Sequence, residues 1–221
     1  MKILFHNIWN MNPKLLSAIR YLKSQSPDVL VIAELPKKRL EAVSEILHEY
    51  PYQVVVAPNK VGSLAVYSKH EISNFSELDE GDFAGRPQGI MDIDVLGKGS
   101  FRLIAIHTAA PLTIKKYKRR NRQLLALSDV IQLEQTQCKP VIIVGDFNTS
   151  HRRKELKDLR TRNNLSEPRL GKRTHASWPM YGRFWCIDHM FCSEHFEIEN
   201  FQLLRSAWSD HRAISAEFIL R

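Results

Sequence analysis

Apolar runs and apolar residues at helical spacing follow one another along this chain, and they predict both strands and helices. The continuous run Val29–Ala33 is typical of a strand that is buried on both faces, and so is Val141–Val144. Leu15, Ile19 and Leu22 recur at the spacing of one helix face. Further strands are predicted at 3–5, 52–56, 64–67, 90–95, 101–107, 185–191, 198–204 and 213–220. Helices are predicted from an N-cap at Asn12 to a stop at Pro27, around 40–47, and from about 116 to 134.

These elements indicate an α/β protein with two packed sheets. About ten strands are too many for one small open sheet, and the few helices are separated along the chain. No repeat, low-complexity tract or linker interrupts the pattern. A chain of 221 residues is long enough for one large core, so we expect residues 1–221 to form one domain.

Short polar signatures lie at the ends of six apolar runs, and their recurrence indicates one shared site. Polar groups at the ends of buried strands are costly unless they serve a purpose. Carboxylates and amides are hard oxygen ligands of the kind that Mg²⁺ prefers, and histidine transfers protons. The signatures are Phe5-His6-Asn7, Ala33-Glu34, Ile106-His107-Thr108, Gly145-Asp146-Phe147-Asn148, Ile187-Asp188-His189 and Ser209-Asp210-His211.

The metal side of this site is predicted from Asn7, Glu34 and Asp210. Glu34 follows the buried run Val29–Ala33, where a carboxylate needs a partner, although an isolated Glu at a strand end is more often a surface residue. Asn7 alone is explained equally well as a turn residue. Asp210 is a second acid beside His211. Together they favour a Mg²⁺ site, which Mn²⁺ could also occupy.

Asp146 and Asn148 form the strongest local signal. They follow the strand Val141–Val144, and side-chain alternation puts both on the same side of the chain. Gly145 allows a substrate or metal to approach the backbone closely. A simple exit from strand to turn explains the same composition, because Gly, Asp and Asn are all favoured there. It does not explain why similar patterns recur at five other strand ends.

Three further residues are candidates for proton transfer. His211 is predicted to be the general base or the group that activates the phosphate, and Asp188 is predicted to orient its imidazole. Alternation places Asp188 and His189 on opposite faces of their strand, so only one of them should face the site. His107 ends another strand and could donate to a phosphoryl oxygen, but for a lone histidine a hydrogen-bonded residue at a strand end is the better interpretation.

The order of these motifs resembles the endonuclease/exonuclease/phosphatase superfamily, which has the deoxyribonuclease I-like fold. The resemblance extends from Phe5-His6-Asn7-Ile8 to Ser209-Asp210-His211, and Ile104–Ala109 resembles the strand that carries the catalytic His of deoxyribonuclease I and the sphingomyelinases. It implies a four-layer sandwich of two mixed sheets flanked by helices. It also implies Mg²⁺-assisted attack of water on a phosphoester, with Asp146 and Asn148 orienting water and phosphate. Whether Asp146 or the His is the base differs between accounts of the family.

Candidate substrate-binding residues come mainly from basic segments. Arg119 lies in the dense run 115–122, and Arg152 lies in a run that follows Asn148, so both are predicted to contact phosphates. A third basic segment spans 169–173. Arg86 precedes a strand and could clamp the phosphate, although such charges are commonly solvated. Trp185 resembles a pocket aromatic of abasic-site endonucleases, and packing against the opposite face is the alternative.

The composition leaves three functions open. The net charge of +8 favours an anionic partner, so we expect a nuclease that acts on DNA or RNA. A phosphoesterase that acts on a lipid or inositol phosphate is the alternative, and a non-catalytic binding scaffold is disfavoured because every expected acidic and His position is occupied. No run reaches the roughly 18 apolar residues that span a bilayer. With no signal peptide and three cysteines at no ligand spacing, we expect a cytoplasmic protein, which we take to be a monomer.

Overall fold

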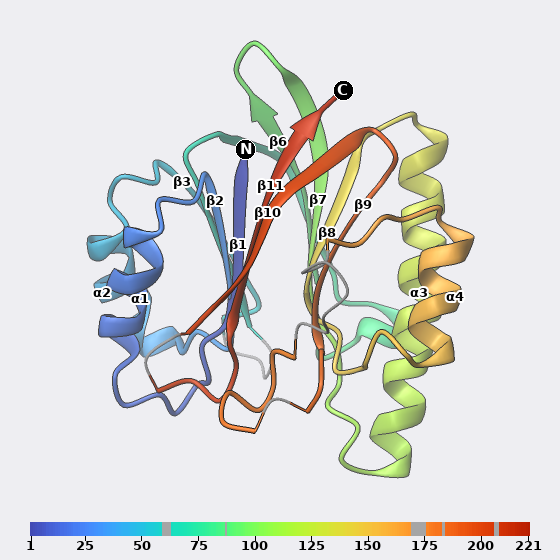
Figure 1. Ribbon diagram of the computed structural model, residues 1–221, viewed down its shortest axis with the longest axis horizontal. Coiled ribbons are helices and arrows are strands. Elements are labelled where there is room, and N and C mark those ends of the chain that lie inside the picture. The colour runs from blue at the N-terminus through green and yellow to red at the C-terminus, as the bar shows by residue number, and fades with distance from the viewer. Residues whose placement is uncertain (59–62, 87, 169–175, 183, 206–207) are drawn as a thin grey trace.

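The computed structural model describes residues 1–58, 63–86, 88–168, 176–182, 184–205 and 208–221. Two β-sheets lie face to face, and helices cover both outer faces (Figure 1). The first sheet has six strands in the order β10-β11-β1-β2-β4-β3, and the second has five in the order β5-β6-β7-β8-β9. The predicted four-layer α/β sandwich is therefore confirmed.

The first sheet joins both ends of the chain. Its strands are β1 (Lys2–Asn7), β2 (Val29–Ala33), β3 (Tyr52–Val56), β4 (Leu64–Ser68), β10 (Phe196–Leu204) and β11 (Ala213–Leu220). Strand β1 runs parallel to β2 and antiparallel to β11. Helices α1 (Leu15–Ser24) and α2 (Leu40–Ile46), with the short 3₁₀ helix η1 (Lys37–Arg39), lie on the outer side of this sheet.

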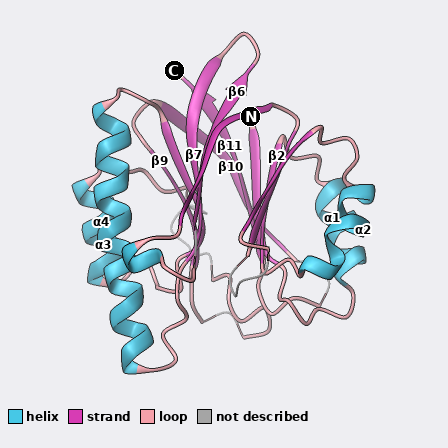
Figure 2. Cartoon of the chain, turned by 180° about the vertical axis from the view of Figure 1, so that it is seen from behind, coloured by secondary structure: helices cyan, strands magenta, loops and turns pink. Residues whose placement is uncertain are grey.

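The second sheet comes from the middle of the chain. Its strands are β5 (Glu71–Leu78), β6 (Gln88–Val95), β7 (Gly99–His107), β8 (Val141–Asp146) and β9 (Asp188–Cys192). Strands β7 and β8 are parallel, and the long helix α3 (Ile114–Thr136) connects them. Helices α3 and α4 (Lys154–Arg162) cover the outer side of this sheet, as the view from behind shows (Figure 2). The 3₁₀ helix η2 (Gly81–Phe83) precedes β6.

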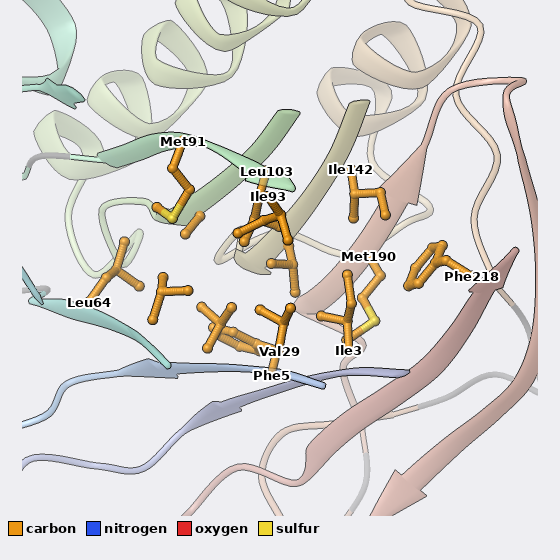
Figure 3. Packing of buried hydrophobic residues seen from close by; sticks show 14 of the residues in the cluster. Ile3, Phe5, Val29, Leu64, Met91, Ile93, Leu103, Ile142, Met190 and Phe218 are labelled. Carbon is orange, nitrogen blue, oxygen red and sulfur yellow. The ribbon is translucent and has the colours of Figure 1, made fainter. Parts of the chain in front are cut away.

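The largest apolar cluster fills the space between the two sheets. It takes alternate residues from both sheets, which is the pattern that period-two strands produce when two inner faces pack together. The inward residues labelled in Figure 3 are Ile3, Phe5, Val29, Leu64, Met91, Ile93, Leu103, Ile142, Met190 and Phe218. A second cluster lies between the first sheet and α1 and α2, and a third lies under α3 and α4.

Two elements differ from the sequence prediction because they bury little apolar surface. Strand β5 is largely exposed along its length and lies at the edge of its sheet. Helix α4 is highly charged and buries only Leu156 and Leu159. Neither segment therefore shows the apolar period that marks a core element.

Element boundaries also shift for local reasons. Helix α1 begins at Leu15 rather than at Pro13, because Asn12 Oδ1 accepts a hydrogen bond from the Lys14 amide at 2.8 Å and holds a turn before the helix. Helix α3 begins two residues before its predicted start, where Thr113 Oγ1 caps the Lys116 amide. Strand β9 begins at Asp188 rather than near Trp185.

Candidate active site

The predicted polar signatures converge at one end of the sandwich. In the first sheet Asn7 pairs with Ala33, which directly precedes Glu34. In the second sheet His107 pairs with Asp146, and Asp146 pairs with Asp188. The strand register therefore places these residues in one row on each sheet. They lie at the end of β1, β2, β7 and β8 and at the start of β9, and these strand ends are at the lower end of the molecule in Figure 1.

Asn7 links the two sheets. Its side-chain amide donates to Glu34 Oε1 at 3.1 Å and to Asp146 Oδ2 at 3.2 Å. The Asn7 Oδ1 atom accepts from the Trp9 amide at 3.1 Å, which fixes the orientation of this side chain. Asn7 and Asp146 are buried, whereas the Glu34 side chain keeps 23% of its surface exposed. The site is therefore assembled from both sheets and opens to solvent beside Glu34.

The backbone around Glu34 and Asn148 is held in the left-handed region. Glu34 has a φ of +61° and Asn148 a φ of +48°. Such values are uncommon for residues other than glycine, and they cluster at functional sites where neighbouring contacts impose them. Glu34 is held by its backbone amide, which donates to the Ser63 carbonyl at 2.9 Å. Asn148 is held because its amide donates to Asp146 Oδ1 at 2.8 Å.

Asp188 and His211 form a buried hydrogen-bonded pair. The His211 Nδ1 atom lies 2.9 Å from Asp188 Oδ2, and its Nε2 atom lies 3.9 Å from Asp146 Oδ2. Burial alone would lower the pKa of His211, but the charges of Asp188 and Asp146 outweigh burial and raise this pKa to about 10. The predicted partnership of Asp188 with His211 is thus present in the geometry, and the expected separation of Asp188 from His189 also holds.

His107 faces the same acidic groups in a different protonation state. Its Nε2 atom lies 3.7 Å from Glu34 Oε1 and 3.8 Å from Asp146 Oδ2. Burial, together with the positive charges of Arg86 and His211, lowers the pKa of His107 well below its usual value. His107 is therefore neutral at pH 7. Asp146 has its pKa raised to about 7 by burial and by the nearby charge of Asp188.

The predicted substrate-binding residues divide into an inner and an outer group. Arg86 is partly buried, and its Nη1 atom donates to the Thr108 carbonyl at 3.1 Å, the same carbonyl that receives the Asn148 side-chain amide. Arg119 donates to the Ala84 carbonyl. Arg152 is exposed in the loop after β8, and the basic segment 169–173 lies outside the described residues.

Trp185 faces solvent on one side and an aromatic neighbour on the other. Half of its surface is exposed, and its ring stacks on Trp178 with centroids 5.5 Å apart. Trp178 in turn donates from Nε1 to Asp210 Oδ2 at 2.8 Å. The Asp210 carboxylate thus has an indole partner, and its predicted role as a metal ligand stays a prediction.

Arg120 is a site residue that the sequence pattern did not distinguish from its basic neighbours. It is 3% exposed, and its Nη1 atom donates to the Asn148 carbonyl at 2.7 Å. The helical spacing could have identified Arg120 as buried, because it shares the buried face of α3 with Leu124 and Leu127.

Gly145 also has a role other than the expected one. An added Cβ would lie 2.0 Å from the Ile106 carbonyl oxygen, so this glycine permits β7 and β8 to pack closely.

The donor atoms at this site fit a hard divalent cation. Glu34 and Asp146 each place a carboxylate oxygen within hydrogen-bond distance of the Asn7 side-chain amide, so two hard anionic ligands lie next to one amide group. Asp146, Asp188 and His211 also have ligand atoms that all lie within 4.8 Å of one another. A cation beside Asp146 would offset the crowding of negative charge that raises the pKa of this carboxyl group.

Comparison with known proteins identifies one family model. The model of the Endonuclease/Exonuclease/phosphatase family matches residues 4–211, which include all six polar signatures. No curated protein sequence matches the chain.

Solved structures with the same architecture are distant in sequence. The human Nocturnin catalytic domain with bound sulfate has a TM-score of 0.78 and 16% identity, over 100% of this chain and 94% of that one. The mannosyl-6-phosphatase Bt3783 of Bacteroides thetaiotaomicron has a TM-score of 0.78 and 15% identity, over 100% of both chains. Truncated TDP2 of Caenorhabditis elegans has a TM-score of 0.77 and 17% identity, over 99% and 96%. At these identities the likeness shows the fold.

Proposed function

Because the chain belongs to the Endonuclease/Exonuclease/phosphatase family, we propose that it hydrolyses phosphodiester bonds in DNA or RNA with the help of Mg²⁺. The observation that carries this proposal is the convergence of Asn7, Glu34 and Asp146 beside the Asp188–His211 pair. A hard cation site next to a hydrogen-bonded His–Asp pair supplies the charge and the proton transfer that water needs to attack a phosphodiester.

Glu34 is proposed as the principal metal ligand, and Asn7 and Asp210 are proposed as the other ligands that the protein provides. A bound Mg²⁺ would polarise a phosphoryl oxygen and neutralise charge that develops on it. Glu34 is suited to this role because its carboxylate is the most solvent-accessible acid among those in contact at the site. Mn²⁺ has similar ligand preferences and is expected to substitute.

Other side chains at the site are proposed to transfer the proton, to orient the water and to contact the phosphate. His211, which Asp188 keeps in its charged form, is proposed to donate a hydrogen bond from Nε2 to the phosphate. Asp146 and Asn148 are proposed to orient the attacking water, and the Asp146 carboxylate, whose pKa is about 7, to accept its proton. Neutral His107 can donate one hydrogen bond to a phosphoryl oxygen without adding a proton. Arg86 lies close enough to Asp146 and Glu34 for their charges to act on its guanidinium group. This position suits a two-pronged contact between the guanidinium group and a phosphate oxygen.

Nucleic acid is favoured because cations surround this end of the molecule. Lys115, Lys116 and Lys118 are exposed in the first turns of α3, and Arg152 and Arg153 are exposed in the loop after β8. A polyanionic backbone would contact several of these groups at once, and each contact would release condensed counterions.

The metal assignment is tested with Glu34→Gln, which keeps the shape of the side chain and removes its charge. We expect this variant to lose turnover of a plasmid, a short RNA and bis-p-nitrophenyl phosphate, and EDTA to abolish the same activities in the unsubstituted protein. Glu45→Gln is the matched control, because Glu45 is an exposed acid on α2, the helix on the outer side of the first sheet. Full activity in EDTA would contradict metal dependence, and hydrolysis of the small diester alone would contradict the nuclease.

A phosphoesterase on a lipid or inositol phosphate is the second candidate. One observation favours it: Tyr181 is 84% exposed in the segment before β9, and Leu112 and Ile114 are 78% exposed at the start of α3. Exposed apolar side chains near a basic surface are typical of proteins that contact a membrane interface. Among the described residues, no helix is long and apolar enough to cross a membrane. Faster release of phosphate from inositol phosphates than cleavage of oligonucleotides would select this candidate.

A further inference from the structure

A pocket of about 270 Å³ lies next to the active site, and no residue that is proposed above for metal binding or proton transfer lines it. One wall is the loop that follows Asn148 and carries His151, Arg152 and Arg153. The opposite wall is the segment before β9 that carries Phe184 and Trp185. The volume is just below the range of about 300–1,000 Å³ that is common for small-molecule sites, so the pocket suits one compact group.

The aromatic wall presents flat apolar surface to solvent. Trp185 is 50% exposed and Phe184 is 71% exposed, and the two rings meet edge to face with centroids 5.8 Å apart. The buried side of Trp185 rests on Trp178, which keeps the ring in place. A fixed aromatic face of this kind is a platform on which another planar ring can stack.

The opposite wall provides cations that are available to a ligand. Arg152 and Arg153 are exposed, and no ion pair within the described part of the chain engages either guanidinium. Guanidinium groups bind phosphate oxygens and also stack on heteroaromatic rings. The pocket therefore combines a stacking platform with positive charge.

Chain connectivity and packing put this pocket beside the reacting phosphate. The cationic loop begins directly after Asn148, and Trp178, which supports Trp185, donates to Asp210 and lies 6.3 Å from the His211 ring. A nucleotide whose phosphate is at the metal site would thus have its neighbour within reach of the pocket.

We propose that this pocket binds one unpaired nucleobase next to the scissile phosphate, so that the preferred substrate is single-stranded nucleic acid. The inference rests on the proposed nuclease function. Stacking on Trp185 and Phe184 requires a base with a free face, whereas both faces of a base inside a duplex are covered by its neighbours. The adjacent phosphate would contact Arg152 and Arg153.

The test measures cleavage, in the presence of Mg²⁺, of a series of short single-stranded oligonucleotides that each carry one abasic nucleotide at a different position. In the unsubstituted protein, removing the base at one position beside the cleaved bond should lower kcat/KM by about 5- to 150-fold, which is the range for loss of one base–aromatic stack. In the Phe184→Ala/Trp185→Ala variant the same abasic nucleotide should not lower kcat/KM any further, because the aromatic rings on which the base would stack are already absent. Annealing the complementary strand should slow cleavage by the unsubstituted protein.

Tyr181→Ala is the matched control. Tyr181 belongs to the same segment and is more exposed than either platform residue, but it does not line the pocket. This variant should keep the full sensitivity to the abasic position. Phe184→Ala alone provides a second variant if the double substitution unfolds, and it should show part of the same loss of sensitivity.

Several outcomes would overturn the proposal. Equal abasic sensitivity with and without the platform, faster cleavage at the abasic position, or a preference for duplex would each refute an unpaired-base pocket while leaving the nuclease intact. Cleavage of bis-p-nitrophenyl phosphate with no cleavage of any oligonucleotide would refute the nuclease itself. Hydrolysis of phosphatidylinositol vesicles that Tyr181→Ala abolishes would assign this surface to a lipid instead.

Discussion

His107 and His211 lie on either side of Asp146 but experience opposite electrostatic environments. Burial favours the neutral form of both imidazoles, and only His211 has a carboxylate, Asp188, in direct hydrogen-bond contact. That contact keeps His211 charged, and the charge of His211 in turn helps to keep His107 neutral. Asp188 therefore sets the protonation state of His211, whereas burial is the main reason that His107 is neutral.

Replacing Asp188 should impair the proposed role of His211 without removing the imidazole. Asp188→Asn is expected to lower kcat by about 10²–10⁴-fold, because a His whose orienting carboxylate is lost adopts the wrong tautomer and loses its counter-charge. The Asp188→Asn/His211→Ala double variant should be little slower than either single variant, since the two residues act as a unit. Steady-state kinetics on a small diester measures this, and multiplicative losses would show that they act independently.

The same pair makes a prediction about pH. The folded pKa of His211, about 10, exceeds the usual value of 6.5, so the pair stabilises the fold fully below about pH 6.5. This stabilisation is lost as pH rises through about 10. In metal-free protein, NMR titration should show a lower His211 pKa in Asp188→Asn than in the unsubstituted protein. An unchanged His211 titration would mean that Asp188 is not its counter-ion.

At the scale of elements, helix α3 supports the loop that carries Asn148. Arg120 lies on the buried face of the helix, packs over Tyr117 with 4.8 Å from its Cζ atom to the ring centroid, and bonds the Asn148 carbonyl. Its loss would leave that carbonyl without its guanidinium partner and loosen the turn that sets Asn148. The long crossover helix between β7 and β8 thus supports the site as well as connecting two strands.

We expect Arg120→Met to lower stability by about 1–3 kcal/mol, and to lower kcat more than it raises KM for a small diester. Arg120→Lys should not restore activity, because a lysine lacks the guanidinium fork. Arg122→Met, on the same helix, removes only an exposed pair with Asp82 and should cost less than about 1 kcal/mol. Equal effects of the Arg120 and Arg122 substitutions in urea unfolding and kinetics would contradict a supporting role for α3.

At the scale of the whole molecule, the inner core makes the two sheets depend on each other. Residues from both sheets share one apolar cluster, and the candidate site at one end of it draws polar side chains from both sheets. We propose that residues 1–221 therefore fold as one domain.

Phe5→Ala tests this dependence, because Phe5 is fully buried between the sheets (Figure 3). It should cost about 3–5 kcal/mol and lower amide protection in β8 as well as in β1, through a single unfolding transition. Leu96→Ala, in a turn where 96% of the side chain is exposed, should change neither quantity. Two separate transitions would show that the sheets unfold as independent units.

Local chemistry in the sequence determined most core elements and the identity of the polar groups. Buried strands such as Val29–Ala33 are apolar throughout, so their position follows from composition alone. The exposed strand β5 and the charged helix α4 escaped prediction, because their place depends on the sheet edge and on α3 rather than on an apolar period of their own.

Only the tertiary structure decided which polar groups meet and in which charge state. Asn7 and Asp146 are 139 positions apart, and their contact depends on two sheets packing in one register. The same packing buries Arg120 while leaving Arg119 partly exposed, although the two are neighbours in one basic run. Sequence spacing reports which residues share a face of an element, whereas burial and distance to other charges arise only when the faces are packed together.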